Sequence, residues 1–454
     1  MTTKIKYKKK ILIVGGGYIG TLTSLLFSQK DDFEVTLVEK QNRLGGLYNS
    51  AWEYGEYCFD YGSRSIVQTN IKDIDNLLWE ILPKSVYPRS KKNLKEFSFQ
   101  KGKLREYSNC LDARLLEIAE KKIALKQMKE IKKSDILNKN LKNLESFCKA
   151  IYGESLTLNL IKPAIEKLTG INMIETDPCA LFAHNLNRLI IANQIESKKL
   201  KSKNVFNDNR IAFSQYDDHV SDLVKMYPRK GGLRDFGKRL HKYLSRRKNV
   251  TIKLENTVNN ILSEGNLIKS VLLKDKTILQ PDIIIWTIPP IFLSKILRLD
   301  SIASKSNEFR NLILSHYVLE GKIKTKAYYL YNYDPQFKNY RTTVYQNFSC
   351  PSDKLKSITV ESFCDEINPE LDYFKNTLFD EIKKMDIISS ESKIIDNKIH
   401  IQKNAIPKYS LKFTKNQNQI FDNLNTKYKN LMVFGNIGGS KSSLNHAYKI
   451  YQEL

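Results

Sequence analysis

Apolar and polar residues near the start of the chain follow the pattern of a strand, a helix and a second strand. Residues 11–14 form an unbroken apolar run, which predicts a buried parallel strand. A helix is expected from about 18 to 29, because its leucines recur on one face. Residues 33–38 are again apolar and β-branched, as in a strand. The order predicts a βαβ unit.

The rest of the chain falls into blocks of different periodicity. The block 71–200 contains few glycines and prolines and carries helical apolar stripes, so it is expected to be mostly helical. Strand patterns return afterwards, and the tyrosine-rich and β-branched runs within 317–361 predict a mixed sheet. The remaining predicted elements are strands at 250–254, 282–287 and 431–434 and a helix from about 442 onward.

The residues between the first strand and the first helix form a glycine turn. Gly15 permits a tight turn, and Gly17 lets the backbone approach a pyrophosphate. Gly20 allows the helix to pack closely on the strand, and the helix N-terminus that includes Tyr18 and Ile19 attracts phosphate. Such a turn alone is weak evidence. Its position between strand and helix makes it a predicted dinucleotide site.

A carboxylate follows the second strand, where it can accept hydrogen bonds from ribose hydroxyls. This residue is Glu39, and Lys40 comes directly after it. The chain therefore both begins and ends with a strand, a glycine turn and a helix. We expect an α/β fold in which a Rossmann-like domain is assembled from discontinuous segments and joined to a second domain of helices and mixed sheet.

The predicted boundaries follow these blocks. The nucleotide-binding domain is expected to comprise residues 1–70, 220–300 and 405–454. The substrate domain is expected to comprise a helical part, 71–219, and a mixed sheet, 301–404. Two domains are also what a chain of 454 residues favours.

Charge changes this interpretation more than overall composition does. Apolar residues make up 41% and charged residues 27%, which is ordinary for a globular protein, whereas the net charge of +25 is unusual. Positive charge can attract a phosphorylated substrate or an anionic membrane surface, or it can be a lysine-rich solvated surface. Lysine clusters such as 198–203 lack a repeating aromatic partner, so no nucleic-acid partner is expected.

Cysteine spacing and hydropathy bear on the cellular compartment. The six cysteines are scattered without a C-x-x-C pair, so neither a metal site nor a disulfide framework is expected. The apolar run after the basic start is too short for a signal peptide, and no run reaches the length of a membrane span. These features predict a cytoplasmic protein.

Further motifs give the chain a family resemblance. Arg43-Leu44-Gly45-Gly46 resembles the second glycine motif of the FAD-dependent oxidoreductases of the flavin amine oxidase, protoporphyrinogen oxidase and UDP-galactopyranose mutase group. Three later segments match that group in order. They are Phe59-Asp60-Tyr61-Gly62, Tyr227-Pro228-Arg229-Lys230-Gly231-Gly232-Leu233 and Phe434-Gly435-Asn436-Ile437-Gly438-Gly439. Motifs in a fixed order are more specific than any single one.

The resemblance implies FAD as the cofactor, bound without a covalent link. The family members that attach flavin covalently use a cysteine in the loop that here reads Ser440-Lys441-Ser442-Ser443. Val258 stands where the family places a backbone contact to adenine, and Asn436 replaces a usual acidic residue. The cofactor-binding residues implied are Gly15, Gly17, Tyr18, Ile19, Gly20, Glu39, Lys40, Arg43, Gly45, Gly46, Asp60, Gly62, Val258, Gly435, Asn436, Gly438 and Gly439.

The resemblance leaves three functions open. The first is an oxidoreductase that transfers a hydride from an anionic or sugar-linked small molecule to flavin N5. The second is mutase-like chemistry on a nucleotide sugar. The third is a non-catalytic scaffold with a flavin fold. The mutases' loop histidine is missing from Gly62-Ser63-Arg64, and 442–446 lacks their tyrosine pair, which counts against the second.

Substrate and partners are predicted from one residue and the overall charge. Arg341 follows Tyr340 in a segment that resembles the one carrying a diphosphate-binding arginine in the mutases, so it is a candidate binder of a substrate anion. The other interpretation is a structural ion pair. The expected partner is a small molecule, phosphorylated or nucleotide-linked among the options, with a peripheral contact to an anionic membrane left open. Catalytic residues and oligomeric state stay unassigned.

Overall fold

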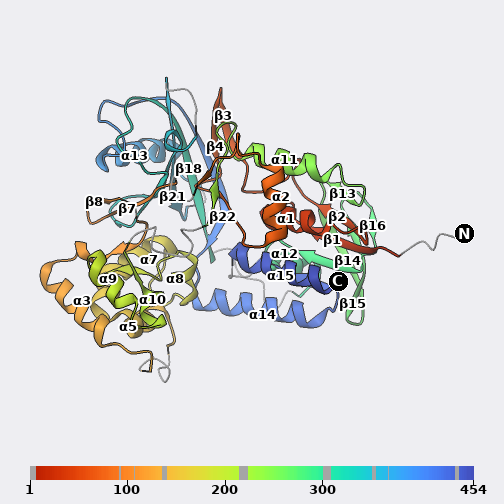
Figure 1. Cartoon of the computed structure of the whole chain (residues 1–454), viewed down its shortest axis with the longest axis horizontal. Helices are drawn as coiled ribbons and strands as arrows, with labels where there is room; N and C mark the ends of the chain where they lie inside the picture. The colour runs from red at the N-terminus through yellow and green to blue at the C-terminus, as the bar shows by residue number, and fades with distance from the viewer. Residues whose placement is uncertain are drawn as a thin grey trace, which may run out of the picture.

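The computed structural model describes residues 7–90, 94–106, 108–134, 141–213, 223–299, 308–349, 354–366, 368–434 and 439–454. Figure 1 shows three regions: a parallel sheet with helices on both sides, a large mixed sheet, and a group of helices beneath the mixed sheet. The first strand and the last helix lie in the same region, although they are farthest apart in the sequence.

A five-stranded parallel sheet receives strands from both ends of the chain. Its strand order is β13-β2-β1-β17-β23, and every neighbouring pair is parallel. The strands are β1 (Lys9–Val14), β2 (Phe33–Val38), β13 (Val250–Lys253), β17 (Ile283–Trp286) and β23 (Leu431–Val433). All five were predicted within a few residues of these bounds, from apolar runs or, for β13, from a period-two alternation, and the Rossmann-like α/β fold class is confirmed.

The two faces of this sheet are covered differently. Ile11 and Ile13 point into a core shared with one set of helices, whereas Leu12 and Val14 point into a second core on the other face. This is the alternation that a strand imposes on successive side chains. The first set is α1 (Tyr18–Phe27), α2 (Lys72–Ile81), α11 (Arg234–Leu244) and α15 (Gly439–Glu453); the other face has α12 (Pro290–Ile296), α14 (Leu411–Lys427), β14 (Val258–Glu264), β15 (Leu267–Leu273) and β16 (Ile278–Leu279).

A seven-stranded mixed sheet forms the second region. Its order is β22-β18-β21-β20-β19-β7-β8, so two strands from the segment before residue 106 extend one edge. The strands are β7 (Glu96–Gln100), β8 (Lys103–Arg105), β18 (Phe309–Glu320), β19 (Tyr329–Asn332), β20 (Asn339–Val344), β21 (Lys356–Cys364) and β22 (Lys393–Pro407). Helix α13 (Leu371–Lys384) packs on one face through Leu378 and Ile382.

The helical region covers the opposite face of the mixed sheet. Leu312 and Leu314 of β18 belong to the core of these helices, whereas Ile313 belongs to the core shared with α13. The helices are α3 (Ile118–Glu130), α5 (Leu144–Tyr152), α6 (Glu154–Leu156), α7 (Lys162–Thr169), α8 (Cys179–Ala183), α9 (Gln194–Lys201) and α10 (Val205–Arg210), with a wider π turn at Thr157–Ile161 and 3-10 turns at Ala113–Leu115 and Tyr345–Asn347.

Short strands connect the three regions. They pair as β3 with β4, as β5-β12-β6 and as β9-β10-β11. Their bounds are β3 (Ser50–Tyr54), β4 (Tyr57–Asp60), β5 (Ile66–Val67), β6 (Arg89–Ser90), β9 (Leu111–Asp112), β10 (Leu189–Ile190), β11 (Ile211–Ala212) and β12 (Lys225–Met226). They make the strand content of 71–200 higher than the helical pattern predicted.

The hairpin β7–β8 also lies within the block 71–200 and adds to its strand content. Residues 96–100 read Glu-Phe-Ser-Phe-Gln, which alternates polar and aromatic residues with a period of two. Phe97 and Phe99 are buried against the mixed sheet. Because longer apolar stripes with helical spacing dominate this block, the five-residue strand pattern was not predicted. The predicted limits of the two domains stay a prediction.

Candidate functional site

The glycine turn between β1 and α1 is packed at the limit of what the backbone permits. Gly15 has φ +104°, a conformation that side chains rarely adopt. A Cβ added to Gly20 would lie 1.8 Å from the carbonyl oxygen of Gly15. Thr287, at the end of β17, donates from its Oγ1 to the carbonyl oxygens of Val14 (2.9 Å) and Gly15 (3.1 Å). Helix and strand therefore meet without room for a methyl group.

Gly17 differs from the other two glycines, because it borders open space. A Cβ at Gly17 would meet no atom within 4 Å. Gly17 also occupies the N-cap of α1, where no side chain caps the helix and no acidic residue lies in the first turn. The N–H groups at the start of the helix, including those of Tyr18 and Ile19, are thus left for an anionic ligand.

Glu39 lies at the end of β2 and is tied to the turn. Its Oε2 accepts from the backbone N–H of Gly16 at 2.6 Å, and its Oε1 accepts from that of Gln41 at 2.9 Å. The side chain is buried, with 8% of its surface exposed. Each carboxylate oxygen has a further lone pair that a ribose hydroxyl can use. Lys40 next to it is exposed.

The second glycine motif packs directly on the first. The N–H of Gly45 donates to the carbonyl of Gly16 at 2.8 Å. A Cβ at Gly46, which has φ +56°, would lie 3.0 Å from the Cα of Gly17. A side chain there would fill the space beside Gly17, so the absence of side chains at both glycines keeps it open. Arg43 lies just before this pair, and its Nη2 is 3.4 Å from the carbonyl oxygen of Ser50.

Asp60 joins two of the sequence motifs. Its Oδ2 accepts from the hydroxyl of Tyr227 at 2.5 Å, and its Oδ1 accepts from the N–H of Leu233 at 3.0 Å. Both donors belong to the segment 227–233. Burial raises the pKa of Asp60 to about 7, against the lowering effect of these hydrogen bonds. The carboxyl is therefore a structural link within the predicted cofactor region.

The last two parts of the predicted cofactor site have different outcomes. Val258 is the first residue of β14 and is buried, close to where the N–H of Asn256 donates to the carbonyl of Glu39 at 2.9 Å. In the C-terminal motif, Gly435, Asn436 and Gly438 lie outside the described residues. Gly439 begins α15.

A cavity of about 870 Å³ borders the cradle formed by the two glycine motifs. Tyr48, three residues after Gly45, lines the cavity and stacks on Tyr18 with ring centroids 4.3 Å apart. Ser63, Arg64 and Ser65 line the same end. The mixed sheet and the helical region supply the other walls, so the cavity lies where all three regions of the fold meet.

Arg341 does line this cavity, but its guanidinium is already bound. Its Nε lies 2.7 Å from Oε1 of Glu361, and its Nη2 lies 2.7 Å from Oε2, which is a bidentate ion pair. Glu361 is fully buried, and it also accepts from the hydroxyl of Tyr340 at 3.1 Å. Gly62 packs against this pair, because a Cβ there would lie 2.9 Å from Nη2 of Arg341. Arg341 therefore has the contacts of a structural ion pair.

Sequence reasoning missed several side chains of the cavity. Lys225 pairs with Glu96, and Arg210 donates to backbone carbonyls of Ile151 (2.6 Å) and Met128 (2.7 Å). Burial lowers the pKa of Arg210 to about 10. No motif marks these residues, because they reach the cavity from separate segments.

Tyrosines form the sheet wall of the cavity. Tyr328 lies just before β19, Tyr329 begins the strand, and Tyr331 follows two residues later. Burial raises the pKa of Tyr328 and of Tyr329 well above the usual value. These hydroxyls stay neutral near pH 7, so they can donate and accept hydrogen bonds without adding negative charge. The tyrosine-rich run is thus partly core and partly cavity wall.

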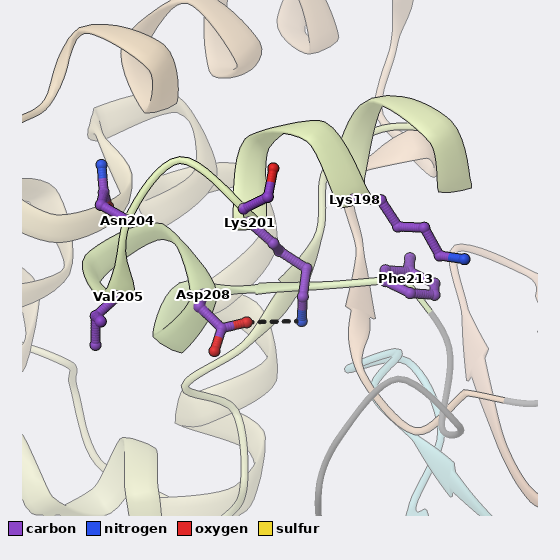
Figure 2. Close-up of a pocket in the computed structure, with 7 residues that line it drawn as sticks. Lys198, Lys201, Asn204, Val205, Asp208 and Phe213 are labelled. Atoms are coloured by element: carbon purple, nitrogen blue, oxygen red, sulfur yellow. Dashed lines mark ion pairs between the residues drawn. The ribbon is translucent and has the colours of Figure 1, made fainter.

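An outer pocket lies beyond Asp208, which lines both hollows. Figure 2 shows Lys201 pointing at Asp208 and Lys198 pointing toward Phe213. The Lys201–Asp208 ion pair is 3.3 Å long, and the two ammonium groups lie 5.3 and 5.5 Å from the centroid of the Phe213 ring. The outer pocket, of about 540 Å³, places positive charge next to the cavity.

Comparisons with known proteins agree with this geometry. Residues 13–81 match the family model of the NAD(P)-binding Rossmann-like domain. No curated protein matches the chain in sequence. Among the described residues, no helix is both long enough and apolar enough to cross a membrane.

Solved structures extend the likeness to nearly the whole chain. A reduced UDP-galactopyranose mutase has a TM-score of 0.74 at 13% identity, over 98% of this chain and 93% of that one. A proposed protoporphyrinogen oxidase from Exiguobacterium sp. 255-15 has a TM-score of 0.67 at 15% identity, over 98% and 99%. Putrescine oxidase bound to putrescine has a TM-score of 0.60 at 12% identity, over 98% and 99%.

These values confirm, at the level of the fold, the resemblance that the motifs predicted. The chain thus has the fold of UDP-galactopyranose mutase, protoporphyrinogen oxidase and putrescine oxidase, and its residues 13–81 match the model of the Rossmann-like domain.

Proposed function

We propose that the chain is a flavin-dependent oxidoreductase of the cytoplasm that binds FAD without a covalent link and acts on a small anionic or sugar-linked molecule. The observation that carries this proposal is the direct contact between the glycine cradle and the cavity, through the stacked rings of Tyr18 and Tyr48. A cofactor held in the cradle would thus lie beside a space large enough for a metabolite.

The residues of the cradle fit FAD. Gly17 and Gly46 leave room where a diphosphate would approach the uncapped start of α1. Glu39, with its two backbone hydrogen bonds, is oriented for a ribose. When bound, the flavin would supply two-electron chemistry by accepting a hydride at N5. The protein's own part is to hold the cofactor, orient the substrate and exclude water.

The charge of the cavity favours an anionic substrate. Several arginines and Lys225 line it, and its carboxylates, Glu96 and Asp208, are each paired with a lysine. The neutral tyrosine hydroxyls suit the polar groups of a sugar or an amine. A basic cavity with hydroxyl donors would bind a phosphorylated or carboxylated metabolite better than an apolar one.

Cofactor binding is tested first. Purified protein is incubated with FAD, desalted, and checked for retained flavin absorbance and quenched flavin fluorescence. Acid precipitation should then release the flavin intact into the supernatant, because the link is non-covalent. Protein that neither contains nor takes up FAD would refute the proposal.

Oxidation is tested next on the FAD-loaded protein. Representative amino acids, polyamines, sugar phosphates and nucleotide sugars are added one at a time without oxygen. A substrate should bleach the flavin absorbance, and readmitted oxygen or an added acceptor should restore it. If no compound bleaches the flavin while several bind, a non-catalytic role becomes the better explanation.

A mutase-like activity is the second candidate. The TM-score of 0.74 to UDP-galactopyranose mutase favours it, against 0.60 for putrescine oxidase. This activity predicts that a nucleotide sugar is converted only after chemical reduction of the flavin, with no net oxidation. Turnover by the oxidised protein with stoichiometric peroxide would exclude it.

A further inference from the structure

The cationic side chains of the cavity differ in whether they are available to a ligand. Arg341 is bound bidentately to Glu361, and Lys225 is paired with Glu96. Arg210 places its donors on backbone carbonyls and on the side chain of Asn207. A ligand would have to displace these partners to use those cations, and a buried charge that loses its partner is costly.

Arg64 is different. Within the part of the chain that the structure describes, its guanidinium has no hydrogen-bonding or ion-pair partner, and its Nε is buried without one. The guanidinium carbon lies 6.0 Å from the centroid of the Tyr48 ring. A buried donor without a partner is unfavourable unless something supplies an acceptor. The cavity, which Arg64 lines, is where that acceptor can enter.

The backbone around Arg64 is held firmly. The hydroxyl of Tyr328 donates to the carbonyl oxygen of Arg64 at 2.6 Å. The N–H of Ser63 donates to Oε1 of Glu361 at 3.2 Å, and Gly62 takes φ +87° against the Arg341–Glu361 pair. The structural ion pair thus positions the loop that carries Arg64. This arrangement holds the base of a binding side chain while leaving its head group available.

We propose that Arg64, rather than Arg341, binds the carboxylate or phosphate of the substrate, at the end of the cavity next to the glycine cradle. The proposal rests on the proposed function and names its anion-binding residue. The planar guanidinium matches an oxyanion with two parallel hydrogen bonds. The rest of the substrate would extend between the tyrosines of the sheet wall and the helical residues Tyr152 and Phe182, which line the cavity as well.

The test measures binding directly. FAD-loaded wild-type protein is titrated calorimetrically with pyrophosphate and, separately, with succinate, so that phosphate and carboxylate are distinguished. Arg64→Gln should weaken the probe that binds by about tenfold to a hundredfold, which is the range for loss of a charge-assisted hydrogen bond. Arg64→Lys should restore part of the affinity, because it keeps the charge but loses the planar fork. Arg246→Gln, an exposed site outside the cavity lining, is the matched control for charge and should bind as wild type.

The possible outcomes separate this inference from the proposed function. Equal probe affinity in Arg64→Gln and in Arg246→Gln would overturn it, as would no binding of either probe to the FAD-loaded wild type. Loss of FAD from Arg64→Gln alone would also overturn it, because Arg64 would then hold the cofactor. If the wild type takes up no FAD, the proposed function fails, and the same titrations on the flavin-free protein still decide the role of Arg64.

Discussion

The glycine cradle and the cavity beside it are built on opposite principles. In the cradle, backbone meets backbone: Gly20 lies against the carbonyl of Gly15, and Gly46 lies against Gly17. In the cavity, side chains from the mixed sheet, the helical region and the loop after β4 converge. A site made of backbone needs glycines at fixed spacing, which a sequence displays. A site made of converging side chains can be recognised only after folding.

The cavity contains a second contrast, between two arginines. Arg341 and Arg64 line the same space, but Arg341 is bound to a buried glutamate and Arg64 is not. The first holds the structure together, and the second is available to a ligand. The predictions below test these two contrasts, from the largest expected effect to the smallest.

Removing the partner of Arg341 should have the largest effect. Glu361→Ala leaves a buried guanidinium without its carboxylate, so the free energy of unfolding should fall by about 3–5 kcal/mol. Urea denaturation followed by circular dichroism measures it. Glu366→Ala, at an exposed position of the same segment, should change stability by less than about 0.5 kcal/mol. If Glu361→Ala is as stable as wild type but no longer binds anions, Arg341 is a ligand-binding residue after all.

A methyl group at Gly20 should be nearly as damaging. The added Cβ would lie 1.8 Å from a backbone oxygen, so α1 and β1 would have to move apart. Overpacking of this kind costs about 3 kcal/mol. Thermal unfolding of Gly20→Ala should show a clearly lower Tm than wild type. An unchanged Tm would mean that the turn is looser than its packing indicates.

Asp60 should make stability depend on pH in an unusual direction. Its folded pKa is raised to about 7 by burial, whereas an unfolded aspartate ionises near pH 3.8. The folded state therefore holds an extra proton between these values, and stability should fall as pH rises through that range. From pH 5 to pH 8 the loss should be about 2 kcal/mol.

The matched variant for this effect is Asp60→Asn, which keeps the acceptor for Leu233 and removes the titration. Its unfolding free energy, measured by denaturant titration at each pH, should fall by less than that of wild type between pH 5 and pH 8. Parallel pH profiles for the two proteins would show that Asp60 is already ionised at pH 5.

Gly17→Ala should have the smallest effect, and on binding rather than stability. The added Cβ meets no protein atom and the φ of −70° suits alanine, so Tm should stay unchanged. The methyl group would occupy space beside the helix start that the cofactor diphosphate needs. We expect FAD affinity to fall about tenfold, equivalent to about 1.4 kcal/mol, in a fluorescence-quenching titration. Loss of Tm with normal FAD affinity would reverse the roles assigned to Gly17 and Gly20.

The two contrasts also explain what the sequence could predict. The strands of the parallel sheet could be predicted because each has a short local pattern, either an apolar run such as Ile283–Trp286 or the alternation of Val250–Lys253. The βαβ unit and the two glycine motifs could be predicted because each is a local pattern, whereas the packing of one motif on the other was seen only in the structure. The link between Asp60 and the segment 227–233 was not, although each motif was noticed separately, because no local pattern encodes a hydrogen bond across 167 residues.

The cavity was predicted least well. Arg341 was singled out as an anion binder, but its buried partner Glu361 lies on the neighbouring strand, where only the register of β20 against β21 brings them together. Arg64 was mentioned only because the loop histidine of the mutases is missing from Gly62-Ser63-Arg64. Tyr48 received no role, although its ring joins the cradle to the cavity. The role of a residue that depends on tertiary contacts cannot be predicted from its own segment of the sequence.

The order of strands in the parallel sheet has a consequence for synthesis of the protein. On the ribosome, β1 and the glycine turn are made hundreds of residues before β17, which pairs with β1, and β23, which pairs with β17. Helix α15, which lies beside α1 and is held there by the hydrogen bond from Lys30 to the carbonyl of Tyr451, is made later still. Until then the part of α1 that packs against α15 has no partner. The parallel sheet around the cradle therefore stays incomplete until these late segments are made, and apolar surface exposed in this way is prone to aggregation.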